Sequence, residues 1–157
     1  IMHRLGDIEV SRLELKQALR TYEQIRKMAP DDEHARRLLV DLNYRQNDPV
    51  SAISELDGLL RVYAKTGQAK RIIQVLDELV TRYPKDMALR SRLSAVYRQT
   101  GNNAKSVEQL AALTDLQLKN GLYNDAMVTV QRIIDLNPPE VADYQKLLAQ
   151  LRGGPAQ

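Results

Sequence analysis

The amino-acid sequence predicts an all-α fold, and three observations support that prediction. Prolines stand at Pro30, Pro84 and Pro138, each 54 positions from the next, and a proline ends a helix because it lacks the amide hydrogen. Turn glycines lie between them at Gly67, Gly101 and Gly121, where a left-handed residue would close a helix. Between these marks the apolar residues recur at offsets of one, three and four, as on one face of a helix; one such run is Ile72, Ile73, Leu76, Leu79 and Val80.

These boundaries predict a series of helices joined by short turns. The expected helices cover residues 32–46, 49–65, 69–82, 86–99, 103–119, 123–136 and 140–152. Residues 7–28 form either one long helix or two, which gives eight or nine helices in all. Leu13 stands 54 positions before Gly67, where a turn glycine would be, and this favours one long helix. We nevertheless expect a break near residues 12–14.

The chain contains an internal repeat that is three helices long. Shifting the sequence by 54 residues places one apolar residue on another and one turn glycine on another; the matched pairs include Ile53 with Val107, Leu56 with Leu110, Leu59 with Leu113, and Gly67 with Gly121. A single such unit cannot cover its own apolar faces, so neighbouring units are expected to stack.

The repeat resembles the tetratricopeptide repeat. The resemblance rests on a turn glycine, an aromatic residue, a small alanine, two packing residues and a closing proline, here Gly121, Tyr123, Ala126, Val130, Ile133 and Pro138. It implies a right-handed superhelical stack of antiparallel helices, a single domain over residues 1–152, with 153–157 as a flexible tail or linker. The family unit has two helices, whereas a third is interposed here, so the helices at 49–65 and 103–119 are expected to serve two neighbours each.

Residue types that catalyse reactions or bind metals are scarce. The chain has no cysteine and two histidines, so we expect no catalytic residue, no metal site and no cofactor, and hence no enzyme. The acidic residues after Pro30 are better explained as caps of the next helix than as metal ligands. No apolar run is long enough to cross a membrane, and the cysteine-free composition favours a cytoplasmic location.

Basic side chains are the remaining candidates for a binding surface. The net charge is +3, and residues 46–105 hold the excess, which favours an acidic partner. If the resemblance holds, several basic residues would face a groove and could pair with carboxylates of an extended peptide; these candidates are Arg37, Arg45, Arg61, Lys65, Arg90 and Arg98.

The predicted function is therefore a non-enzymatic scaffold that binds a protein or peptide, as one module of a larger protein. One alternative is a nucleic-acid-binding helical repeat, although no column of base-reading side chains recurs in the aligned units. Another is a homo-oligomer formed through an exposed N-terminal edge, where Arg26 replaces the aliphatic residue of later units.

Overall fold

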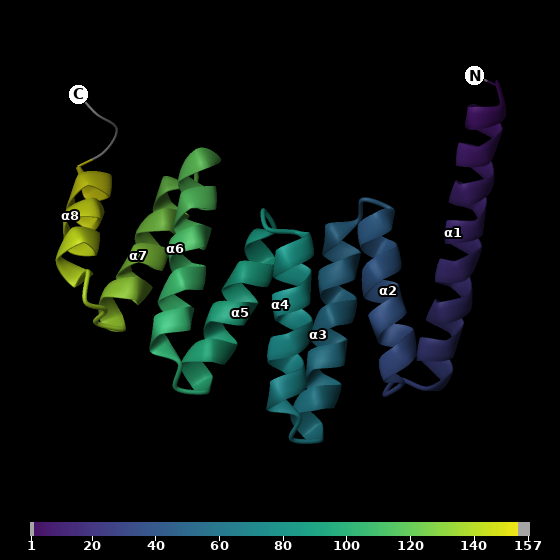
Figure 1. The fold of residues 1–157 in the computed structure, drawn as a ribbon, viewed down its shortest axis with the longest axis horizontal. Helices are drawn as coiled ribbons and strands as arrows, with labels where there is room; N and C mark the ends of the chain where they lie inside the picture. Colours follow the sequence, from purple (N-terminus) through teal and green to yellow (C-terminus); the bar gives the residue numbers. More distant parts are fainter. Residues whose placement is uncertain (1, 154–157) are drawn as a thin grey trace. The chain divides into compact units, whose positions relative to one another are not determined.

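The protein is all-α, as the sequence predicts. The structure is a computed structural model that describes residues 2–153, with side chains from residue 11 onward, and this part of the chain contains eight helices and no strand. The helices are α1 (Met2–Met28), α2 (Glu33–Arg45), α3 (Pro49–Lys65), α4 (Ala69–Arg82), α5 (Met87–Gln99), α6 (Asn103–Lys119), α7 (Tyr123–Asp135) and α8 (Val141–Arg152) (Figure 1). The bounds of α2 to α8 agree with the predicted ones to within one residue, and α1 begins five residues before the predicted segment.

The helices group into two compact units. The first covers Ile1–Ala69 and holds α1, α2 and α3; the second covers Lys70–Gln157 and holds nearly all of α4 together with α5 to α8. Within each unit, sequential neighbours such as α2 and α3, or α6 and α7, run antiparallel (Figure 1). The single domain over 1–152 and the right-handed superhelix stay predictions, and most of the proposed tail lies outside the described residues.

The first helix corrects one prediction. Residues 7–28 belong to a single helix, and the expected break at residues 12–14 is absent. Leu13 remains helical with its side chain 59% exposed. With neither glycine nor proline at this point, the backbone has no reason to leave the helix, and the missing turn glycine marks a continuous helix.

The helix ends reproduce the 54-residue repeat in their hydrogen bonds. Asp32 accepts from the amide of Ala35 at 2.9 Å, and Asp86 accepts from the amide of Leu89 at 3.1 Å, so equivalent residues cap α2 and α5. The capping interpretation of the acidic residues after Pro30 is thus confirmed for Asp32. Asp48 and Asn102 cap α3 and α6 in the same way.

Equivalent apolar residues form the core of each unit. Leu39 in α2 and its counterpart Leu93 in α5 are both fully buried, and Leu56 in α3 and its counterpart Leu110 in α6 are fully or almost fully buried. In the first unit Leu19 of α1 packs with Leu39 and Leu42. In the second unit Leu110 and Leu113 of α6 pack with Ile133 of α7. Helix α6 therefore contacts both α5 and α7, as predicted for the helix at 103–119, which was expected to serve two neighbours.

An arginine ties the turns at Pro30 and Pro84 to the helices that follow them. Arg36 donates from Nε to the carbonyl of Pro30 at 2.6 Å, and Arg90, its equivalent, donates from Nε and Nη2 to the carbonyl of Pro84 at 3.2 Å. Each arginine also contacts the helix that follows its own, α3 for Arg36 and α6 for Arg90. Arg36 Nη1 lies 3.5 Å from Oε2 of Glu55.

Arg90 makes the matching contact in the second unit. Its Nη1 donates to Oε1 of Gln109 at 2.9 Å, and Gln109 occupies the position equivalent to Glu55. The same guanidinium therefore fixes a turn carbonyl and the neighbouring helix in both units.

Glu55 also binds a residue that sequence reasoning placed on a solvent-facing edge. Arg26 of α1 forms an ion pair with Oε1 of Glu55, whose side chain is 8% exposed. The expectation that Arg26 lies at an open edge is therefore wrong, because its guanidinium supplies the second cation that a buried carboxylate requires. Gly58 makes room for this cluster, since a Cβ there would collide with the guanidinium of Arg36.

Replacing Gly101 with alanine should destabilise the protein. Gly101 has φ +82 with open space around it, so alanine would be strained only through its backbone conformation, which costs about 1–2 kcal/mol. The equivalent residue in the first unit is Asn47 with φ 59, and Gly101→Asn should therefore lose less than Gly101→Ala. Urea unfolding of the three proteins measures the difference, and equal stabilities for alanine and asparagine would contradict this assignment.

Removing the carboxylate of Glu55 should destabilise the first unit. Glu55→Ala leaves Arg26 and Arg36 without their counter-charge in a partly buried place, and the free energy of unfolding should fall by about 2 kcal/mol or more. Glu55→Gln should lose less, because the second unit holds its arginine with Gln109. Urea denaturation tests this order, and a Glu55→Ala variant as stable as the parent protein would refute it.

Candidate functional site

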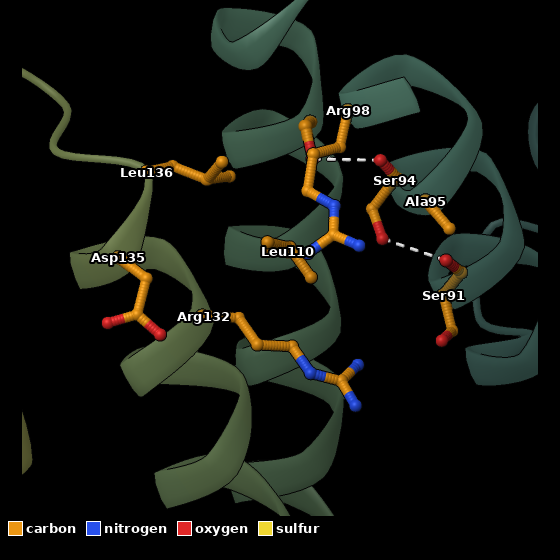
Figure 2. Close-up of a pocket in the computed structure, with 9 residues that line it drawn as sticks. Ser91, Ser94, Ala95, Arg98, Leu110, Arg132, Asp135 and Leu136 are labelled. Atoms are coloured by element: carbon orange, nitrogen blue, oxygen red, sulfur yellow. Dashed lines mark hydrogen bonds between the residues drawn. The ribbon is translucent and has the colours of Figure 1, made fainter. Parts of the chain in front are cut away.

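A cavity in the second unit is the best candidate for a binding site. It has a volume of about 400 Å³ and lies between α5, α6 and α7. α5 contributes Ser91, Ser94, Ala95 and Arg98, α6 contributes Ser106 and Leu110, and α7 and its end contribute Arg132, Asp135 and Leu136. Figure 2 shows α5 and α7 on opposite sides, with Leu110 of α6 between them.

Two arginines reach into this cavity without a protein partner. Arg98 extends from the end of α5 toward Leu110, and Arg132 extends from α7 into the same space (Figure 2). Both residues are exposed, and within residues 11–153 neither guanidinium makes a hydrogen bond or an ion pair. The carboxylate of Asp135 points away from both guanidiniums and accepts from Nε2 of Gln131 at 2.9 Å. The two cations are therefore available to an anionic group.

The serines beside them form a fixed wall. Ser94 Oγ donates to the carbonyl of Ser91, and Ser106 Oγ donates to the carbonyl of Ser94, both at 2.8 Å. Because the hydroxyl protons of Ser94 and Ser106 bind backbone oxygens, the charged donors left for a ligand are the two guanidiniums, beside the hydroxyl of Ser91. A planar guanidinium can bind both oxygens of a carboxylate at once.

A second cavity, also of about 400 Å³, continues the first along the same helices. Ser91 and Arg132 line both cavities. The second one extends toward the start of α5 and α7, and its apolar lining consists of Met87, Leu113, Leu122 and Val128, together with the Cβ of Ala88. Asp125, Gln117 and Thr129 complete it. The two cavities form a groove with α5 and α7 as walls and α6 as floor, charged at one end and apolar at the other.

The structure does not bring the six predicted groove residues together in one site. Of the six, Arg98 lines the first cavity. Arg90, on the same helix, is bound to Pro84 and Gln109. Arg37 lies 3.9 Å from Asp41 within α2. Arg45, Arg61 and Lys65 are exposed on α2 and α3 of the first unit. The structure thus separates arginines that hold the fold from those that face a cavity.

Arg132 is the cavity residue that sequence reasoning missed. The equivalent residue one repeat earlier is Glu78, which has the opposite charge, so an alignment of the units shows no recurring basic residue at the position of Arg132. The available signal was its position in α7, four residues after Val128, with both side chains on the exposed face of the helix.

The tyrosine at the end of α5 packs within the unit. Tyr97 is 5% exposed, and its hydroxyl lies 3.0 Å from both carboxylate oxygens of Asp77 in α4. Burial, and then the carboxylate of Asp77, raise the pKa of Tyr97. Tyr97 therefore packs between helices and does not line the groove.

Two further features of residues 2–153 bear on function. No three potential metal ligands gather in this part of the protein. None of its helices combines the length and hydropathy that a membrane crossing needs.

Comparisons with known proteins agree with the repeat. Residues 3–69, which span α1, α2 and α3, match the tetratricopeptide repeat family. No curated protein matches the chain.

Three solved structures are similar over most of the chain at low sequence identity. TTC0263, a thermophilic tetratricopeptide repeat protein of Thermus thermophilus, is 18% identical, with 94% of this chain and 95% of that chain covered and a TM-score of 0.33. YrrB, a tetratricopeptide repeat protein with an unusual peptide-binding site, is 17% identical, with 92% and 90% covered and a TM-score of 0.36. A tetratricopeptide repeat protein of Parabacteroides merdae is 14% identical, with 93% and 68% covered and a TM-score of 0.31.

Two arginines of α5 should respond differently to the same substitution. Arg90→Gln removes hydrogen bonds to Pro84 and Gln109, and should lower the free energy of unfolding by about 1–2 kcal/mol. Arg98→Gln removes a side chain without a partner, and should change it by less than about 0.5 kcal/mol. Thermal and urea unfolding of both variants tests this, and equal losses would show that Arg98 also holds the fold.

Proposed function

We propose that the protein, whose residues 3–69 match the tetratricopeptide repeat family, is a non-enzymatic scaffold that binds an acidic segment of a protein or peptide partner in the groove between α5 and α7. The observation that carries the proposal is the pair formed by Arg98 and Arg132, two exposed guanidiniums that line one cavity from facing helices and have no partner within residues 11–153. A cytoplasmic location remains an expectation from the sequence.

The mechanism is presentation of charge by a rigid surface. The walls of the groove belong to helices whose inner faces are buried, so a bound segment does not have to order them. Each guanidinium offers two parallel donors to a carboxylate, and the apolar floor of Leu110 reduces competition from water. Both features favour a flexible segment that carries aspartate or glutamate.

Substituting the two cations should abolish most of the binding. We expect a fluorescein-labelled, Glu-rich peptide to bind the parent protein, and each of Arg98→Gln and Arg132→Gln to weaken it about tenfold, or about 1.4 kcal/mol each. Fluorescence anisotropy measures the affinities. Arg61→Gln is the matched control, because it removes the same charge from an exposed position on α3 in the first unit.

Two results would contradict the proposal. The groove is not the site if the Arg98 and Arg132 variants bind as tightly as the Arg61 control. Tighter binding of an unrelated single-stranded RNA, with several decades of affinity lost as salt rises, would favour the nucleic-acid alternative. Light scattering of the parent protein at two concentrations tests the homo-oligomer.

A further inference from the structure

The groove joins a charged cavity to an apolar one, and this junction restricts the kind of segment that fits. Arg132 lines both cavities, and Val128 stands one helical turn before it on α7. Val128 is 55% exposed and Leu122 is 38% exposed, which is unusual for large apolar side chains that surround a cavity on a folded surface. A ligand that binds only through its charge would leave these side chains in water.

The spacing along α7 matches that of an extended peptide. Val128 and Arg132 are four residues apart, which is about 6 Å along a helix. Side chains two residues apart in an extended chain point to the same side and lie about 6.8 Å from each other. A segment running along the groove could therefore place one side chain at Arg132 and the next but one against Val128.

The charges of the groove fix which side chain goes to which end. Arg98 lines only the first cavity and Arg132 stands where the two cavities meet, whereas the residues that line only the second cavity include Asp125, Met87, Leu113 and Leu122. An acidic side chain at the second end would meet a carboxylate, and an apolar one at the first end would leave both guanidiniums unpaired. Charge complementarity thus assigns the acidic residue to the arginine end.

We propose that the partner is an extended segment in which an acidic residue and a large aliphatic residue are separated by one position, the carboxylate binding at Arg98 and Arg132 and the aliphatic side chain filling the cavity lined by Met87, Leu113, Leu122 and Val128. This inference rests on the proposed function and adds the identity of a second side chain and its spacing. The spacing of the two peptide residues follows from the distance between Val128 and Arg132 along α7. The direction of the peptide chain is not fixed by the groove, so either order of the acidic and the aliphatic residue fits the proposal.

The test uses short capped peptides that differ in one feature. Labelled octapeptides of glycine and serine carry Glu-x-Leu, Leu-x-Glu, Glu-x-Ala or the adjacent pair Glu-Leu. The better of the two spaced peptides should bind about tenfold more tightly than Glu-x-Ala, because a leucine leaves water. The adjacent pair should bind no better than Glu-x-Ala, because its leucine points out of the groove.

A matched pair of variants locates the aliphatic site. Val128→Ser should remove the preference for leucine while binding of Glu-x-Ala is kept, and Val50→Ser, which changes an 80% exposed valine on α3, should leave both unchanged. Val128 also lines a cavity of about 350 Å³ between α7 and α8 with Met127 and Leu148. Leu122 lines the cavity between α5 and α7 and does not line the one between α7 and α8, so Leu122→Ser should also reduce the preference for leucine.

The outcomes separate the two proposals. The inference alone is overturned if Glu-x-Ala binds through Arg98 and Arg132 but leucine adds nothing, if the adjacent pair binds as well as the spaced ones, or if Val128→Ser keeps the preference. Absence of binding by every peptide would overturn the proposed function together with the inference.

Discussion

The structure depends on one constraint: helices of 12 to 17 residues, such as α2 to α8, cannot remain folded in water unless an apolar face is covered by a neighbour. α2 packs against α3 and α5 packs against α6, and leucines of these helices such as Leu39 and Leu93 are fully buried. The proline turns and the arginines that donate to their carbonyls hold each pair at its angle. Everything on the outer surfaces, including the groove, is positioned by this stacking. A rigid groove is what a scaffold needs, since little ordering of the protein then opposes binding.

Much of this arrangement could be predicted from the sequence, because the features that set it are local. A proline ends a helix through its own missing donor, and a glycine at positive φ closes one through its own backbone, so the helix bounds followed from single residues such as Pro84 and Gly101. The long first helix was misjudged because a break was expected near residues 12–14 although Leu13 stands where later units have a turn glycine. The absence of a breaker is itself the local signal, and it predicts continuity.

The site was harder to predict, because it depends on which cations are already bound. In the sequence Arg90 and Arg98 are alike, and the difference between them is a carbonyl at Pro84 and an amide at Gln109, which only the fold brings within reach of Arg90. Arg26 was misplaced for the same reason, since its partner Glu55 is 29 residues away. Arg132 was overlooked because the repeat has glutamate at the matching position. Non-local pairing cannot be read from spacing alone, whereas helix ends can.

The exchange of Glu55 for Gln109 between the two units has a consequence for how a duplicated module can diverge. A carboxylate at this point of the first unit needs two cations and so draws in α1 through Arg26, whereas an amide is satisfied by Arg90 alone. One copy of the repeat thus anchors α1, and the other holds its own helices together without a carboxylate. Division of labour between copies of a repeat can begin with a single exchange of oxygen for nitrogen.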